Sequence, residues 1–309
     1  MTPSPVRVPP SGEQFQLTCG GQAATIVEVG GGIREYSVDG YPVLQPYPLQ
    51  AMCDGAHGAP LIPWPNRLGD GRYAFDGTDY QVALNEPEKC NAIHGFLRWR
   101  SWRAVEQAPD RVVMGTRLHP LQGYPFTLEV EVAYQLDEAG LTVRTTATNV
   151  GEHTCPYGCG QHPYLSPGPG LVDDCTLQLD AATRILTDDQ RQLPTGRQPV
   201  QGTPDDFRAG RQLGDLRLDY AFTDLGRDEH GKAWARLGRP DGSSAQIWVD
   251  ESYPIIEIYT ADTLAPDRQR KGLGTEPMTC PPNAFQSGDN VIRLQPGAST
   301  TSSWGARLR

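Results

Sequence analysis

The sequence contains no long hydrophobic run and no excess of basic charge. None of its apolar stretches approaches the roughly 18–20 residues that a membrane-spanning helix needs. Acidic residues outnumber basic ones 37 to 27, which gives a net charge of −10. Because that charge repels phosphate backbones and anionic lipids, we expect neither nucleic acid nor a membrane as the main partner. A small neutral substrate is compatible with it.

Features of an exported protein are also lacking. Residues 1–12 are rich in Pro and Ser, and no apolar segment of a secretory signal follows them. The seven cysteines are an odd number scattered along the chain, which fits reduced thiols better than a disulfide framework. These features predict a cytoplasmic protein.

Three short motifs of common enzyme classes are missing. The sequence has no GxGxxG after a strand and no GxxxxGK[ST], so nucleotide binding has no support. It has no GxSxG, so an α/β-hydrolase is not indicated. We therefore expect no cofactor of these classes.

Helix signals are rare, whereas turn residues are abundant, with 34 Gly and 28 Pro. The best helix signal is Thr203-Pro204-Asp205-Asp206, a capping-box pattern that predicts one or two helical turns. The composition otherwise favours strands joined by turns.

The clearest strand covers residues 127–136, where apolar and polar side chains alternate with period two. After a turn at 137–140, a second alternating segment at 141–148 predicts a long hairpin. Asp76-Gly77 predicts a tight turn between two further short strands at 73–75 and 80–82. Other expected strands are 24–29, 32–38, 99–106, 111–118, 176–179, 233–237, 245–249, 255–260 and 291–294. Strands without intervening helices predict an all-β fold, two large antiparallel sheets packed as a β-sandwich in one domain over residues 1–309.

Two of the six histidines stand in segments suited to ligand binding. His94 precedes Gly95 in a polar, turn-rich segment, and His162 lies between a glycine-rich stretch and Pro163. Loops of this kind let a backbone approach a ligand closely. Either residue could equally be a loop histidine that is hydrogen-bonded to its neighbours.

A carboxylate, Glu276, lies in a proline-rich segment at 274–283, which we expect to be neither a helix nor a central strand. A rigidly held carboxylate is a candidate general base, although a surface loop glutamate fits the same pattern.

His153, Cys155, Cys159 and His162 lie close enough in sequence to suggest zinc ligands. Their spacing matches none of the usual zinc fingers, and Pro156 and the glycines interrupt a regular strand. We expect no metal site.

Six segments together resemble the aldose 1-epimerase (galactose mutarotase) family, in that family's order and over some two hundred residues. They are Ile62-Pro63-Trp64-Pro65-Asn66-Arg67 with Asp70-Gly71-Arg72-Tyr73; Leu84-Asn85-Glu86 leading to Asn91-Ala92-Ile93-His94-Gly95; His162-Pro163-Tyr164; Leu218-Asp219; Ile258-Tyr259-Thr260; and Thr275-Glu276-Pro277.

The resemblance implies a large galactose mutarotase-like β-sandwich (supersandwich) with an open sugar cleft and no cofactor. It also implies that Glu276 is the catalytic base, His162 the catalytic acid and His94 a second active-site histidine. By the same resemblance, the residues that hold the sugar or lie beside the acid are Asn66, Arg67, Tyr164, Asp219 and Glu257. Arg67 and Asp219 could instead form a salt bridge, with each other or with Asp70.

Glu257 departs from the family pattern, which often has Gln at this position. An ionised Glu only accepts hydrogen bonds, whereas Gln also donates them. The resemblance therefore does not identify the preferred sugar.

The implied reaction interconverts the α and β anomers of an aldohexose. Ring opening removes the O1 proton and protonates the ring oxygen O5, and we expect the Glu276 carboxylate and a His162 imidazolium to exchange these protons.

Three alternatives stay open. A phosphorylated or sulfonated hexose would need cationic groups, for which Arg98, Arg100, Arg268, Arg270 and Lys271 are candidates. A non-catalytic carbohydrate-binding sandwich would bind sugar without turnover. A lyase or hydrolase would need a tyrosine or a carboxylate pair in the cleft. We expect a monomer or homodimer.

Overall fold

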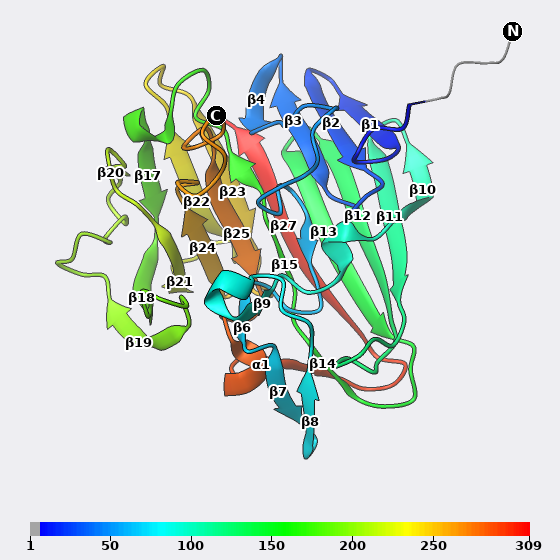
Figure 1. The fold of residues 1–309 in the computed structure, drawn as a ribbon. Coiled ribbons are helices and arrows are strands. Elements are labelled where there is room, and N and C mark those ends of the chain that lie inside the picture. The colour runs from blue at the N-terminus through cyan, green and yellow to red at the C-terminus, as the bar shows by residue number, and fades with distance from the viewer. Residues whose placement is uncertain (1–6) are drawn as a thin grey trace, which may run out of the picture.

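The computed structural model of the protein describes residues 7–309, and its regular secondary structure is almost entirely antiparallel strand (Figure 1). The predicted long hairpin is its most regular part. Strands β12 (Leu128–Asp137) and β13 (Gly140–Asn149) pair without interruption from Leu128↔Asn149 to Asp137↔Gly140. Their apolar faces are buried, as the period-two pattern predicts.

This hairpin lies in a nine-stranded sheet with the order β10-β11-β12-β13-β27-β23-β22-β17-β20. The remaining strands of the sheet are β10 (Arg103–Ala108), β11 (Arg111–Leu118), β17 (Thr176–Leu179), β20 (Arg211–Gln212), β22 (Ala233–Gly238), β23 (Ser244–Val249) and β27 (Ser299–Leu308).

A second, twelve-stranded sheet has the main order β1-β2-β3-β4-β16-β25-β24-β21-β18-β19, with β15 joined to β25 and β5 joined to β15. Its strands are β1 (Gln14–Cys19), β2 (Gln22–Val27), β3 (Ile33–Val38), β4 (Tyr41–Leu44), β5 (Pro60–Leu61), β15 (Gly160–Gln161), β16 (Tyr164–Leu165), β18 (Ala181–Thr187), β19 (Pro194–Pro199), β21 (Asp219–Leu225), β24 (Ile255–Tyr259) and β25 (Leu273–Met278).

The two sheets pack face to face, with β1 against β11 and β12 and with β4 against β23 and β27. The core between them is large and apolar, and it includes the fully buried side chains Leu17, Tyr134 and Trp304. The expected all-β sandwich is therefore confirmed.

Smaller elements extend the sandwich. Three two-stranded ladders join β6 (Arg67–Gly69) to β9 (Asn91–Ile93), β7 (Arg72–Phe75) to β8 (Thr78–Gln81), and β14 (Cys155–Tyr157) to β26 (Ile292–Leu294). The β7–β8 pair is the hairpin expected around Asp76-Gly77. The helical elements are α1 (Ala284–Ser287) and the 3₁₀ turns η1 (Pro87–Lys89), η2 (Leu97–Trp99) and η3 (Val172–Asp174). Among residues 7–309, no helix is long and apolar enough to cross a membrane.

The helix expected at Thr203–Asp206 is wrong, because these residues form turns. Thr203 Oγ1 donates to the Val200 carbonyl at 2.7 Å and accepts the Asp205 N–H at 3.2 Å. Asp206 accepts hydrogen bonds from the backbone and side chain of Arg208. These local hydrogen bonds satisfy the groups that would otherwise cap a helix. The residues that follow are too few to offset the unfavourable free energy of helix nucleation.

The expectation for 274–283 is also wrong in its first half, since β25 is a central strand between β24 and β16. Pro277 is tolerated because of the direction of its nitrogen. The N–H groups of Thr275 and Thr279 point to the carbonyls of Pro163 and Cys159 on the β15–β16 side. With period two, the Pro277 nitrogen points to the same side, where that edge is interrupted between β15 and β16, so no ladder bond is lost. The strand expected from residue 99 begins later, at Arg103, after η2.

Candidate active site

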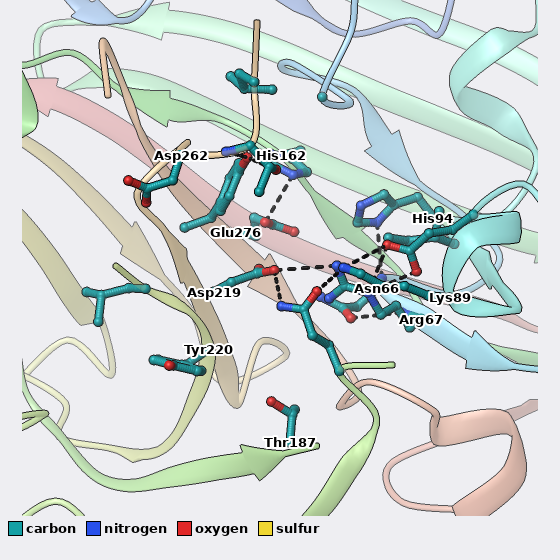
Figure 2. A pocket seen from close by; sticks show the side chains of 18 of the residues that line it. Asn66, Arg67, Lys89, His94, His162, Thr187, Asp219, Tyr220, Asp262 and Glu276 are labelled. Carbon is teal, nitrogen blue, oxygen red and sulfur yellow. Dashed lines mark hydrogen bonds and ion pairs between the residues drawn. The ribbon is translucent and has the colours of Figure 1, made fainter. Parts of the chain in front are cut away.

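A cavity of about 820 Å³ opens over the twelve-stranded sheet, where β21, β24 and β25 lie side by side. Figure 2 shows Glu276 and Asp219 on its sheet side, opposite Asn66, Arg67 and His94. Of the eight predicted site residues, seven line the cavity: Asn66, Arg67, His94, His162, Tyr164, Asp219 and Glu276. The eighth, Glu257, is buried in β24 beside Glu276 and does not line the cavity.

Glu276 and His162 are in direct contact at the floor of the cavity. Oε1 of Glu276 lies 3.1 Å from Nε2 of His162, and the two residues are only 2% and 5% exposed. Oε2 of Glu276 has no hydrogen-bond partner within residues 7–309. A carboxylate and an imidazole at this distance can pass a proton between them or to a bound molecule.

His162 is held by the core between the sheets. It lies at the break between β15 and β16, directly after Gln161. The Gln161 side chain donates to Tyr134 Oη at 3.0 Å and accepts from Trp304 Nε1 at 3.2 Å, and both partners belong to the nine-stranded sheet. The backbone of His162 is bonded to Gly58 and Ala59. The sandwich core thus fixes the backbone that carries this ring.

His94 follows β9 in a left-handed conformation, with φ of 65°. Gly95 follows with φ of 62°, and a Cβ there would lie 2.0 Å from the Ile62 carbonyl oxygen, so the tight turn requires glycine. His94 Nδ1 accepts the Asn66 N–H at 3.1 Å. Its Nδ1 therefore carries no proton, and Nε2–H is its donor. The His94 and His162 rings meet edge to face with centroids 5.4 Å apart.

Tyr164 stacks on His162, with ring centroids 4.9 Å apart and planes 18° from parallel. The Tyr164 ring also stacks on His57, with ring centroids 4.5 Å apart. Its hydroxyl donates to the Gly55 carbonyl at 2.9 Å. The ring therefore orients the imidazole of His162, while the hydroxyl is already engaged by the backbone.

Arg67 forms the opposite wall of the cavity. Its guanidinium binds Glu86, with Nε 3.0 Å from Oε2, and Asp219, with Nη2 3.4 Å from Oδ2. Of the salt bridges considered from the sequence, the one between Arg67 and Asp219 forms, whereas Asp70 binds Arg191 instead. Gln192 also donates to Asp219.

Burial displaces the pKa values of these groups from their ordinary range. It raises the pKa of Glu276 well above 4.5, and the neighbouring carboxyls of Glu257 and Asp219 raise it further. Burial lowers the pKa of His162 to about 3, and the charge of a protonated His57 acts in the same direction. An ionised Glu276 at 3.1 Å would favour the imidazolium, so the acid form of His162 depends on the charge of Glu276.

The cysteine–histidine group considered as a zinc site does not converge. His153 is exposed, Cys155 Sγ faces the Leu294 carbonyl, and Cys159 Sγ contacts Tyr253 and Ser302. Within residues 7–309, the one group with three potential metal-binding atoms within 4.8 Å of one another is His94, His162 and Glu276. Two of these groups, His162 and Glu276, are in direct contact with each other.

Several cavity residues were not singled out from the sequence. Glu86 was quoted only as part of a motif, and its role in holding Arg67 depends on tertiary contact. Gln192 reaches the site from a loop between β18 and β19 that has no motif. His57, which stacks on Tyr164 but does not line the cavity, has no distinguishing sequence context.

The chain matches the family model "Aldose 1-epimerase" over residues 13–306. It is 34% identical over 288 residues to the uncharacterized protein YihR of Escherichia coli, covering 93% of this chain and 90% of the relative. It is 31% identical over 257 residues to the galactose mutarotase of Rattus norvegicus, covering 77% of this chain and 69% of that protein. A solved aldose epimerase homologue from Caenorhabditis elegans superposes with a TM-score of 0.85 at 20% identity, covering 96% and 98% of the two chains.

Proposed function

The chain belongs to the aldose 1-epimerase family, and from this premise we propose that it is an isomerase that interconverts the α and β anomers of an aldohexose. The observation that carries the proposal is the contact between Glu276 and His162 on the floor of the cavity. Ring opening of a hemiacetal needs one group that takes a proton and another that gives one. A carboxylate and an imidazole in contact meet that need with no further reagent.

In the proposed reaction, Glu276 removes the proton from O1 while His162 donates the proton of its Nε2 to O5. The C1–O5 bond breaks and the open-chain aldehyde forms. Rotation about C1–C2 presents the other carbonyl face, and the two residues exchange roles as the ring closes. Each positioned group contributes roughly 10²–10⁴ in rate.

The hydroxyl groups of the sugar would be held by the wall opposite the sheet. Arg67 offers guanidinium donors, Asp219 offers carboxylate acceptors, and His94 offers its Nε2–H. The salt bridges of Arg67 with Glu86 and Asp219 hold these groups in place before a substrate arrives. Binding then requires little reorganisation of the site.

The charges that line the cavity favour a neutral sugar. Eight acidic residues line it, namely Asp54, Glu86, Glu88, Asp188, Asp189, Asp219, Asp262 and Glu276, against the four basic residues Arg67, Lys89, Arg98 and Arg217. An excess of negative charge disfavours binding of an anionic substrate.

A second candidate is an anionic hexose, phosphorylated or sulfonated. Arg98 favours it, because this side chain lines the cavity and its buried Nε has no hydrogen-bond partner in the described part of the chain, residues 7–309. Of the other cationic candidates, Arg268 binds Asp54, and Arg270 binds Asp173 and Asp262, so both are committed to salt bridges.

We also propose a cytoplasmic location, supported by seven cysteines that are all free. We expect the protein to be a monomer or a homodimer, and size-exclusion chromatography with light scattering would measure its oligomeric state. The binding partner that we expect is the small sugar substrate.

The decisive experiment follows pure α-anomers of glucose, galactose and an anionic hexose to equilibrium by polarimetry or proton NMR. Wild type, Glu276→Gln and buffer alone are compared, with Glu131→Gln as a matched control on the exposed side of β12. Acceleration by wild type and Glu131→Gln, lost in Glu276→Gln, supports the mutarotase and ranks its sugars. Sugar binding without acceleration would favour a non-catalytic carbohydrate-binding sandwich and reject the proposed reaction.

A further inference from the structure

Glu257 and Glu276 are direct cross-strand neighbours. Glu257 in β24 pairs with Glu276 in β25, and Ala221 in β21 pairs with Glu257 on the other side. Side chains at paired positions of adjacent strands lie on the same face of a sheet, so the two carboxyl groups stand side by side. Like charges directly opposite each other destabilise a sheet.

Their surroundings differ in polarity. Glu276 faces the cavity and has the imidazole of His162 at hydrogen-bond distance. Glu257 is 2% exposed, and its buried Oε2 has no hydrogen-bond partner among the residues that the structure describes. Next to it, a small apolar cluster of Ile185, Ala221, Ile255 and Met278 occupies the same part of the sheet. The environment of Glu257 is therefore the less favourable one for a negative charge.

Within residues 7–309, the one cation near Glu257 is Arg67, and it is largely committed to other groups. From β21, Asp219 faces Glu257; from β25, Glu276 does; and from β6, Arg67 approaches with a positive charge. The guanidinium of Arg67 directs its hydrogen bonds at Glu86 and Asp219. A single guanidinium cannot compensate four carboxylates, and Lys89 reaches only Glu86 among them, at 3.4 Å.

We propose that Glu257 holds a proton at neutral pH, so that Glu276 is the carboxyl of the pair that exchanges its proton. As a carboxylic acid, Glu257 is uncharged and regains the hydrogen-bond donor that an ionised glutamate lacks. It is a positioning residue, which acts on the reaction through Glu276. The shift in the pKa of Glu257 agrees with a protonated side chain, because burial and the charge of Asp219 raise this pKa well above 4.5. The catalytic consequence rests on the function proposed above, whereas the protonation does not.

Infrared spectroscopy tests the protonation directly, because a carboxylic acid has a carbonyl stretch that a carboxylate lacks and that shifts in D₂O. Wild type, Glu257→Gln, Glu276→Gln and the double variant would be recorded at neutral pH, with Glu131→Gln as control. We expect a protonated-carboxyl band in wild type that Glu276→Gln keeps and Glu257→Gln loses. No such band in Glu276→Gln, or a spectrum of Glu257→Gln identical to wild type, would overturn the proposal. Circular dichroism checks that each variant is folded.

The pH profile of kcat/KM tests the consequence for catalysis. Because Gln replaces a group that is already uncharged, we expect the acid limb of Glu257→Gln to move by less than about half a pH unit. If Glu257 were ionised, its replacement by Gln would instead lower the pH of the acid limb by about one unit or more. A shift of that size would show that Glu257 carries a charge in the active enzyme. If wild type proves inactive while Glu276→Gln keeps its infrared band, the proposed function fails and the protonation of Glu257 stands.

Discussion

The nine-stranded and twelve-stranded sheets differ most clearly in β12 and β25. In β12, buried and more exposed side chains alternate along the whole strand, and the apolar ones pack in the core. In β25 all six residues are buried, including Thr275, Glu276 and Pro277. One face of β25 packs on the core, while the other lies beneath the cavity and its wall. A strand covered on both faces can hold a carboxyl group away from water, which β12 cannot do.

The comparison separates stability from chemistry. The nine-stranded sheet supplies long, regular ladders with a buried apolar face, whereas the strand residues Tyr164, Asp219 and Glu276 that line the cavity belong to the twelve-stranded sheet. Substitutions in the two sheets should therefore affect different measurements.

The largest expected effect is on the chemistry. His162→Asn removes the group proposed to protonate O5, and we expect the mutarotation rate to fall by about 10²–10⁴. The urea midpoint should change little, because the backbone of His162 stays anchored through Gln161. His119→Asn, at an exposed position after β11, is the control. A rate loss below tenfold would contradict the role of His162.

The converse substitution lies in the nine-stranded sheet. Leu128→Ala removes a fully buried side chain of β12, and we expect a loss of about 2–5 kcal/mol in the free energy of unfolding. The rate per folded molecule should stay at the wild-type value. Urea unfolding and mutarotation on the same sample would measure both, with Leu84→Ala at a partly exposed position as reference. A specific loss of activity would show that the two sheets are not separable in this way.

A third effect concerns pH. Burial lowers the pKa of His57 from 6.5 to about 4, so the folded protein binds fewer protons than the unfolded chain between these values. The stability associated with neutral His57 is present above pH 6.5 and is lost as pH falls towards 4, by up to about 3 kcal/mol. His57→Gln should show a smaller loss of stability between pH 7 and pH 4.5 in urea unfolding. An equal loss in both proteins would mean that His57 titrates normally.

The smallest expected effect tests the stacked rings. Tyr164→Leu removes the ring that orients His162, and aromatic contacts of this kind contribute about 0.5–1.5 kcal/mol. We expect kcat to fall about two- to tenfold with less change in KM. Tyr164→Phe keeps the ring but loses the hydrogen bond to Gly55, and should stay close to wild type. Equal losses in both variants would assign the effect to the hydroxyl instead.

Local sequence patterns were sufficient for the regular part of the fold. Alternation in residues 127–148 predicted β12 and β13 to within a residue or two, because one face of that hairpin is buried and the side-chain period of a strand is two. The turn at Asp76-Gly77 was predicted for the same kind of local reason. The capping-box pattern at Thr203 was misleading, since its hydrogen bonds also fit a series of turns.

The candidate site was likewise predictable from the sequence only in part. The order of six motifs along the chain indicated the family and named the residues of the candidate site, seven of which line one cavity. No local pattern indicates that β25 is a central strand, because prolines near Glu276 argue against one unless the neighbouring strand is interrupted at that point.

By itself, the sequence determined the all-β class, the main hairpin and the family of this protein, since these depend on period, turn chemistry and residue type. Only the tertiary structure decided that Glu276 contacts His162, that Arg67 is held by Glu86 and Asp219, and that Glu257 lies beside Glu276 rather than in the cavity. Distance, burial and charge between residues far apart in the chain set these relations. They also set the pKa values of the carboxyl and imidazole groups, which no local pattern encodes.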